Sequence, residues 1–125
     1  YAEVAGYACT HSAGKADYTE AQAMKDVISK ALAKAGYQAS DIDCVYAVIS
    51  NEAEKQAAES AVLTEVFGAK EIRDVREQTG DCRAASANAQ LVEAAKAIDG
   101  GSVKHTLAVS YGCGSYTAVV LKECE

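Results

Sequence analysis

The sequence predicts an α/β domain in which five strands and three helices alternate along one chain. Apolar residues recur at helical spacing in three segments, short runs rich in β-branched residues lie between them, and glycine-containing breaks separate the segments. The expected order is β-α-β-α-β-α-β-β, with short connections and no linker or internal repeat. Strands that alternate with helices usually pair in parallel. We therefore expect a mixed, mostly parallel five-stranded sheet with helices packed on it, and an antiparallel edge from the last two strands.

The N-terminal part of the chain is expected to form a strand, a loop and a helix. Tyr1–Cys9 begins with the alternation of a strand, and residues 10–17 are small and polar, as in a loop. The first helix is predicted from the spacing of its apolar residues, and Gly36 is expected to end it. These apolar residues are Ala23, Met24, Val27, Ile28, Ala31, Leu32 and Ala35.

The middle of the chain predicts a buried strand followed by a second helix. Asp41–Ser50 is an apolar run with β-branched residues, which is typical of a strand covered on both faces. Asn51 can cap the next helix, with Glu54 three residues later as its capping partner. The helix is expected to end at Phe67-Gly68 and to bury a face made of Ala58, Ala61, Val62 and Val66.

The C-terminal part predicts a short strand, a helix of small residues and two final strands. Glu71–Val75 is the short strand, and the helix runs from about Arg83 to Ile98. The final strands, Thr106–Ser110 and Tyr116–Lys122, flank a turn at residues 111–114. Because this turn joins two strands, its glycines do not form a phosphate-binding loop, which needs a helix N-terminus behind it.

Size and charge exclude several classes of protein. The chain has 125 residues, which fits one domain at 1–125, and its net charge of −6 argues against nucleic acid as a partner. No apolar run approaches the roughly 20 residues that span a bilayer, and no charged-then-apolar leader is visible. We expect a cytoplasmic protein without a membrane partner, and a chain cut from a longer protein.

The cysteine content predicts neither a disulfide framework nor a metal site. The five cysteines are odd in number and form no C-x-x-C pair, so we expect reduced and mostly buried thiols. With only His11 and His105 available and no short ligand spacing, zinc is not expected, and no cofactor is indicated. His11 is interpreted as a surface residue, and His105 as remote from the turn at residues 111–114.

Five motifs occur in the order and near the spacing found in one family. They are Ala2-Glu3-Val4-Ala5-Gly6-Tyr7, Tyr37-Gln38-Ala39-Ser40-Asp41-Ile42-Asp43, Val66-Phe67-Gly68, Thr79-Gly80 with Ala84-Ala85-Ser86-Ala87, and Ser110-Tyr111-Gly112-Cys113-Gly114. Together they resemble the C-terminal half of the β-ketoacyl synthases of the thiolase superfamily. The resemblance implies a thiolase-like half-domain, which in the family pairs with a second half in a five-layered unit.

The resemblance also shows where this chain departs from the family. In the family, two histidines help to decarboxylate the malonyl unit, and Val48 and Asp81 occupy their positions here. Arg76 stands at the position of a family lysine. Valine offers no hydrogen-bond donor to an enolate, and a carboxylate would repel its negative charge. The family nucleophile belongs to the N-terminal half, so we expect no catalysis by this chain alone.

The turn and its surroundings are the expected substrate-binding region. Cys113 stands where a family phenylalanine gates the pocket, Thr117 replaces an asparagine, and Gly112 and Gly114 flank Cys113. Gly112, Cys113 and Gly114 are the predicted contacts with substrate. Trimming between Gly68 and Arg76, and after the small-residue helix, predicts minimal loops and limits how much acyl tunnel the chain can line.

Other residues have a functional and a simpler interpretation. Asp81 and Arg76 can form an ion pair that replaces histidine and lysine, or be two solvated charges before a helix. Glu59 matches a family glutamate, but a glutamate on a helix face is usually solvated. Cys82 and Cys113 can approach each other where the pocket is expected, but thiols without a nearby base are inert.

The leading hypothesis is a non-catalytic, chain-length-factor-like half-domain. It implies a scaffold or tunnel-wall role in fatty-acid or polyketide elongation, with a ketosynthase N-terminal half or another synthase subunit as partner. Acyl carrier protein is a further candidate partner, and apolar partner faces predict homo- or hetero-oligomers. One alternative is a cysteine-dependent acyl-transfer or thioester-handling enzyme that uses Cys113 or Cys82. Another is a stand-alone acyl-binding module.

Overall fold

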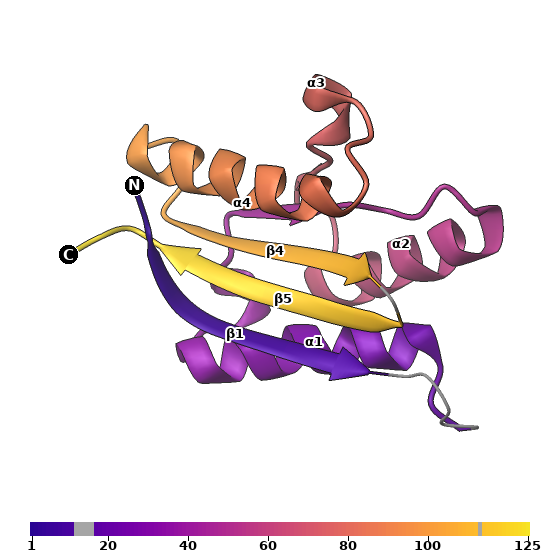
Figure 1. The fold of residues 1–125 in the computed structure, drawn as a ribbon. Helices are drawn as coiled ribbons and strands as arrows, with labels where there is room; N and C mark the ends of the chain where they lie inside the picture. Colours follow the sequence, from indigo (N-terminus) through magenta and orange to yellow (C-terminus); the bar gives the residue numbers. More distant parts are fainter. Residues whose placement is uncertain (12–16, 113) are drawn as a thin grey trace.

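The computed structural model describes residues 1–11, 17–112 and 114–125. Within these residues the chain forms a five-stranded sheet, with strand order β1-β5-β4-β2-β3, between layers of helices (Figure 1). The predicted order β-α-β-α-β-α-β-β is confirmed, with a short helix, α3, and a 3₁₀ turn, η1, in addition. The elements are β1 (Glu3–His11), α1 (Glu20–Ala35), η1 (Ala39–Asp41), β2 (Cys44–Ala47), α2 (Ala53–Phe67), β3 (Ile72–Arg73), α3 (Arg76–Thr79), α4 (Ala84–Asp99), β4 (His105–Gly112) and β5 (Ser115–Lys122).

The sheet is less parallel than predicted. β2 pairs in parallel with β3 and β4, but β5 pairs antiparallel with β4 on one side and with β1 on the other. The prediction that the last two strands form an antiparallel edge is therefore wrong, because β1 forms that edge and β5 lies inside the sheet. The short connection between β4 and β5 predicts that these two strands pair with each other. It does not determine which strand β1 pairs with, and β1 lies beside β5.

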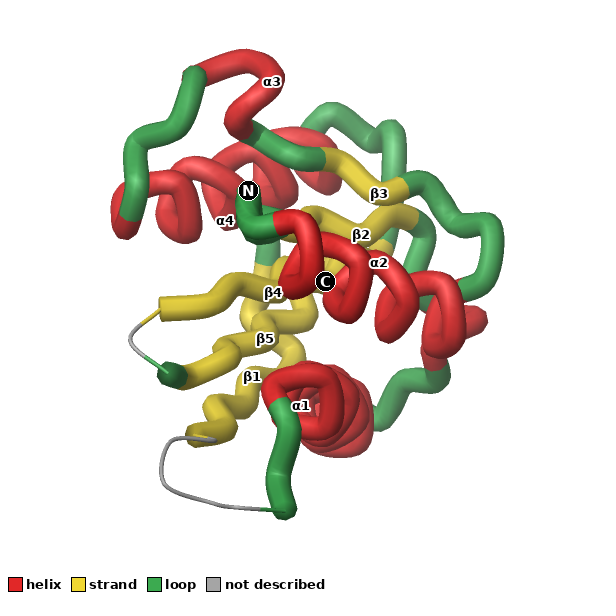
Figure 2. Tube along the Cα trace, turned by 90° about the vertical axis from the view of Figure 1, so that its right-hand side faces the viewer, coloured by secondary structure: helices red, strands yellow, loops and turns green. Residues whose placement is uncertain are grey.

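Helices cover the two faces of the sheet unequally. Figure 2 shows α1 and α2 on one side of the strands and α4 on the other. The larger core lies between the sheet and α1 and α2, and includes Val27, Ile28 and Phe67. The smaller core lies under α4, which packs over β4 and β2. Fully burying one such aliphatic side chain contributes about 1.5–3 kcal/mol, so the α1–α2 face dominates stability.

Helix α1 lies directly against the edge strand β1. Thr19 caps its N-terminus by accepting a hydrogen bond from the Gln22 backbone N–H, and Gly36 ends it at φ 75° as predicted. At Gly6, a β-carbon would lie 2.5 Å from the Ala31 carbonyl oxygen and 2.7 Å from the Ala35 nitrogen. Glycine is therefore required here for the helix to approach the strand this closely.

Helix α2 differs from its prediction at both its cap and its buried face. Glu52, not Asn51, is the N-cap residue, and its side chain makes no capping hydrogen bond. The buried residues are Glu59, Val62, Leu63 and Phe67, whereas Ala58 and Ala61 are exposed. The bulkier Leu63 and Phe67 fill the core, so the helix is rotated relative to the predicted alanine face.

One half of the α4 side of the sheet is open. Helix α4 buries Ser86, Gln90, Ala94 and Ile98 and packs mainly over β4 and β2, while Thr117 of β5 stays exposed. We define the open face as the exposed residues of β1 and β5 and the outward side of α4: Tyr7, Cys9, His11, Thr117, Ala85, Asn88 and Val92. Val92 is 53% exposed and Tyr7 is 63% exposed, so the face carries uncovered apolar surface.

None of the helices within the described residues has the length and apolar character needed to span a bilayer.

The contact at Gly6 predicts a strong effect of the smallest possible substitution. Gly6→Ala should destabilise the protein by about 1–3 kcal/mol, because the new methyl group meets backbone atoms that cannot move aside easily. Gly112→Ala is the stability control, since a β-carbon there meets nothing within 4 Å. Urea unfolding of the two variants measures the difference, and equal stabilities would contradict the close packing of α1 on β1.

Candidate functional site: a pocket at the turn end of the sheet

A pocket of about 310 Å³ lies at the end of the sheet where β4 turns into β5. It is lined by residues from the end of β2, the start of α4 and both strands of the hairpin: Val48, Arg83, Ala84, Ala87, Ser110, Tyr111, Gly112, Ser115 and Thr117. We call this the turn pocket.

Strand geometry explains why these distant segments meet. β2 and β4 run in parallel, so the residue after β2, Val48, comes to the same end of the sheet as Ser110 and Gly112. Side chains alternate between the faces of a strand. Val109 belongs to the core under α1 and α2, so Ser110 faces the α4 side. Helix α4 starts beside them, and its first residues close the pocket.

The structure brings together only part of the predicted site. Val48 and Gly112 line the turn pocket, together with Thr117. Gly114 lies in the turn itself with φ of 81°, a conformation that favours glycine. Cys113 lies outside the described residues.

Arg76 and Asp81 lie in a neighbouring hollow rather than in the turn pocket. This hollow is lined by Asn51, Asp74, Arg76, Glu77 and Asp81. Arg76 forms its ion pair with Asp74, at 2.5 Å, and also donates to the Ile49 carbonyl oxygen. Neither interpretation of these two residues holds for Arg76, because it pairs with Asp74 rather than with Asp81 or with solvent. Asp81 is exposed and accepts a hydrogen bond from the Arg83 backbone N–H.

The Asp74–Arg76 pair changes the titration of both groups. Burial alone would raise the pKa of Asp74, but hydrogen bonds from the Arg76 side chain and backbone outweigh it and lower the pKa. The hydrogen bond to Asp74 raises the pKa of Arg76 in turn. Since Arg76 also contacts Ile49 and Asn51, this pair fixes the chain that follows Val48.

Glu59 is buried, so the prediction that it is solvated is wrong. It is 3% exposed and accepts hydrogen bonds from the Ser50 backbone N–H at 2.9 Å and from the Tyr116 hydroxyl at 2.8 Å. Burial and this hydrogen bond raise the pKa of Tyr116, which keeps its hydroxyl protonated and able to donate. The sequence signal for this burial is helical spacing, which places Glu59 on the same side of α2 as Val62, Leu63 and Phe67.

The histidines and cysteines are placed largely away from the pocket lining. His11 is exposed as predicted, but its Nδ1 lies 2.8 Å from the Ser115 Oγ, its cross-strand neighbour. His105 begins β4, at the end opposite the turn, as predicted. Cys9, Cys82 and Cys124 are exposed, so the expectation of mostly buried thiols is wrong for the described residues. Only Cys44 among them is buried, and burial raises its pKa.

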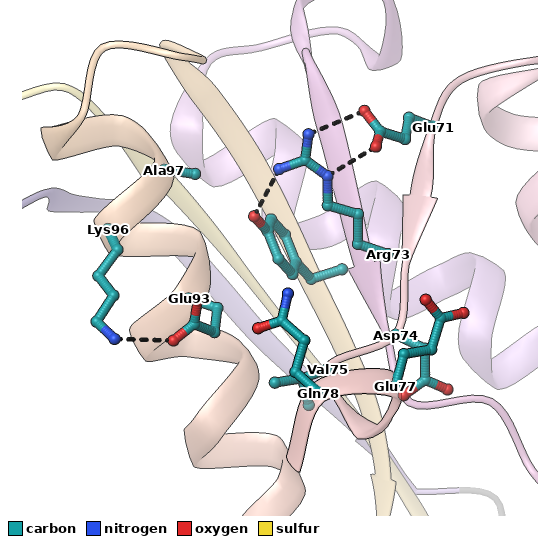
Figure 3. Close-up of a pocket in the computed structure, with 10 residues that line it drawn as sticks. Glu71, Arg73, Asp74, Val75, Glu77, Gln78, Glu93, Lys96 and Ala97 are labelled. Carbon is teal, nitrogen blue, oxygen red and sulfur yellow. Dashed lines mark hydrogen bonds and ion pairs between the residues drawn. The ribbon is translucent and has the colours of Figure 1, made fainter. Parts of the chain in front are cut away.

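A second, larger hollow lies beside the C-terminal half of α4. Figure 3 shows Arg73 between Glu71 and the Tyr46 hydroxyl, with Lys96 and Glu93 on the opposite wall. Its volume is about 500 Å³. The guanidinium of Arg73 lowers the pKa of Glu71, so the carboxylate stays ionised and paired. Since these charges are matched within the protein, this hollow is a weaker candidate for an acyl ligand than the turn pocket.

The turn pocket can bind an acyl group but carries little acid–base chemistry. Val48, Ala84 and Ala87 provide apolar surface, and the hydroxyls of Ser110, Ser115 and Thr117 provide polar contacts. None of the described lining residues is a histidine or a carboxylate. Nor do the described residues include a group of three or more side chains that could hold a metal ion.

Comparison with protein families identifies the family of the chain. Residues 1–110 match the model of the β-ketoacyl synthase C-terminal domain, so the chain belongs to this family. Comparison with curated proteins gives no match.

Solved structures with the same fold include ketosynthase–chain length factor proteins and a ketosynthase in complex with an acyl-carrier protein. The PfaC keto synthase–chain length factor superposes with a TM-score of 0.88 at 24% identity, over 100% of this chain and 13% of that chain. The ishigamide ketosynthase/chain length factor superposes with a TM-score of 0.85 at 19% identity, over 99% of this chain and 38% of that chain. The third structure is AntDE:AntF, a type II PKS acyl-carrier protein in complex with its ketosynthase bound to the hexaketide. It superposes with a TM-score of 0.83 at 22% identity, over 100% of this chain and 39% of that chain. This chain therefore spans well under half of these proteins.

The lowered pKa of Asp74 predicts an acid-dependent part of stability. Folding lowers the pKa of this carboxyl from about 3.8 in the unfolded chain. Its contribution to stability is therefore present at pH values above 3.8 and is lost as the pH falls through the lower pKa of the folded state. Asp74→Asn should therefore be less stable than the wild type at neutral pH, and the difference should shrink below pH 3.8. Urea titrations across this range test it, with the exposed Asp99→Asn as control. A difference independent of pH would contradict the assignment.

Burial of Glu59 predicts a large loss on truncation. Glu59→Ala leaves the Ser50 N–H and the Tyr116 hydroxyl without their acceptor, which should cost about 3 kcal/mol of unfolding free energy. The exposed Glu54→Ala on the same helix should change it by less than about 0.5 kcal/mol. Thermal and urea unfolding provide the comparison, and similar losses in the two variants would argue against a buried, hydrogen-bonded Glu59.

Proposed function

We propose that this chain is one domain, residues 1–125, that acts as a non-catalytic half of a β-ketoacyl synthase. In this proposal it supplies scaffold and part of the acyl-tunnel wall in fatty-acid or polyketide elongation. The C–C bond-forming acyl transfer is carried out by an N-terminal half or by a partner synthase subunit. The proposal rests on membership of the family and on the chemistry of the turn pocket.

The observation that carries the proposal is Val48 in the wall of the turn pocket. The resemblance places a family histidine at this position, and decarboxylation needs a donor directed at the thioester oxygen. Valine supplies none, and Asp81, at the second histidine position, lies in the neighbouring hollow beside Arg76. The pocket keeps apolar surface for a chain while lacking these two donors.

The open face supports a partner that adds a second helix layer. One face of the sheet carries two helices, α1 and α2, whereas the other carries α4 over β4 and β2. Small or apolar residues on the outward side of α4, among them Ala85 and Val92, permit close approach of another helix. The much longer chains of the structural neighbours agree with a missing half. Two of them are ketosynthase–chain length factor pairs and one is a complex with acyl-carrier protein, and we propose partners of these kinds here.

The first experiment determines the size and partners of the native product. Intact mass of the protein purified from its native host should exceed 13.0 kDa several-fold, or a synthase subunit should co-purify with it. The isolated chain should release no CO₂ from a malonyl thioester. A 13.0 kDa product without a synthase partner, or decarboxylation by the chain alone, would overturn the proposal.

The open face predicts a sensitive position on α4. Val92→Arg should abolish capture of the synthase partner and reduce self-association of the isolated chain, because a charge replaces an exposed apolar side chain of the face. Ser29→Arg, an exposed change on α1, is the matched control. Co-purification and light scattering measure both effects. Partner capture by Val92→Arg at the level of Ser29→Arg would exclude this face as the interface.

A further inference from the structure

We propose that Lys55 and Glu59 are positioning residues of the turn pocket. They act from the opposite face of the sheet, through Tyr111 and Tyr116, and hold the end of the β4–β5 hairpin so that the pocket wall is formed before any partner binds. This inference rests on the proposed acyl-binding role of the pocket.

The hairpin carries an aromatic pair between two pairs of pocket residues. Tyr111 and Tyr116 are direct cross-strand neighbours, and their ring centroids lie 4.9 Å apart. The neighbouring cross-strand pairs are Ser110 with Thr117 on one side and Gly112 with Ser115 on the other. All four residues of these flanking pairs line the turn pocket. The position of the aromatic pair therefore sets the position of the pocket wall.

Side-chain alternation separates the two sets. Tyr116 is part of the core under α1 and α2. Tyr116 thus projects to the α1–α2 side of the sheet, whereas Ser110 and Thr117 project toward α4. Tyr111 contacts Lys55 and Glu20 on the α1–α2 side and is also part of the pocket lining. A residue that fixes the aromatic pair acts on the pocket without touching a ligand in it.

Helix α2 holds the aromatic pair at two points. Lys55 and Glu59 are four residues apart and so lie on one side of the helix. The Lys55 ammonium lies 2.9 Å from the ring centroid of Tyr111 and 5.9 Å from that of Tyr116. Glu59 accepts the hydrogen bond of the Tyr116 hydroxyl, so one helix contacts both rings.

Helix α1 completes the attachment of Tyr111. The Tyr111 hydroxyl donates to a Glu20 carboxylate oxygen at 3.1 Å, and the other carboxylate oxygen lies 3.6 Å from the Lys55 ammonium. The Lys55 side chain is only 14% exposed, so its cation–π contact is partly shielded from water. Glu59 meanwhile fixes the chain beyond Val48 through the Ser50 N–H, which ties both walls of the pocket to α2.

The test measures binding of an acyl probe, octanoyl-N-acetylcysteamine thioester, by the full 125-residue chain. Lys55→Met should weaken binding about three- to tenfold, and Lys55→Arg, which keeps a cation over the ring, should restore it. The matched control is Lys25→Met, which removes a lysine that also links α1 and α2, through Glu65 at 2.6 Å, but does not contact the hairpin. Lys25→Met should bind the probe as the wild type does.

Tyr116→Phe and Glu59→Gln are a second test. Tyr116→Phe removes the hydrogen bond between the two residues and Glu59→Gln weakens it, and both keep the overall shape of the side chain. Both should weaken probe binding by more than Lys25→Met at comparable unfolding free energy. Equal binding by Lys55→Met and Lys25→Met, or failure of Lys55→Arg to restore binding, would overturn the inference and leave the scaffold proposal intact. No binding by the wild type would overturn the acyl pocket itself, whereas partner capture tests the scaffold role separately.

Discussion

The pairing of β5 on both sides is the constraint from which the site follows. Because β5 runs antiparallel to both β1 and β4, the end of the first strand and the turn of the last hairpin come to one end of the sheet. The parallel pairing of β2 with β4 brings Val48 to the same end. Helix α4 then closes the pocket from one face, and α1 and α2 support it from the other (Figure 2).

The end of the sheet that carries the turn pocket is held by polar groups whose burial costs free energy unless they are hydrogen-bonded. A carboxylate at 3% exposure is tolerated only where donors replace water, and Glu59 finds them on β5 and in the chain after β2. The Asp74–Arg76 pair performs a similar task for residues 49–51. The chain thus forms a pocket whose wall is apolar at Val48, with Asp81 in the neighbouring hollow. This arrangement is the basis of the proposal that the half-domain shapes an acyl site for a catalytic partner.

Local patterns were reliable where neighbouring residues determine the structure, and unreliable where distant segments compete. The element order, the end of α1 at Gly36 and the hairpin at residues 105–122 follow from periodicity and glycine, and were predicted. Asn51 was a plausible cap, yet its carboxamide oxygen accepts from Arg76 instead, at 3.4 Å. Glu59 was expected in solvent because a glutamate on a helix face is usually solvated, and only the packing of α2 buries its side chain.

The sequence alone determined the family and the order of the elements, because motif spacing and hydrophobic periodicity depend on residues near one another in the chain. Tertiary structure decided which charges pair, which thiols are buried and which side chains line the pocket. Arg76 selects Asp74 over Asp81, and Tyr116 meets Glu59, 57 residues away in the chain. Such contacts depend on distances between segments that only the packed sheet and helices fix. They are therefore properties of the whole fold rather than of any stretch of its sequence.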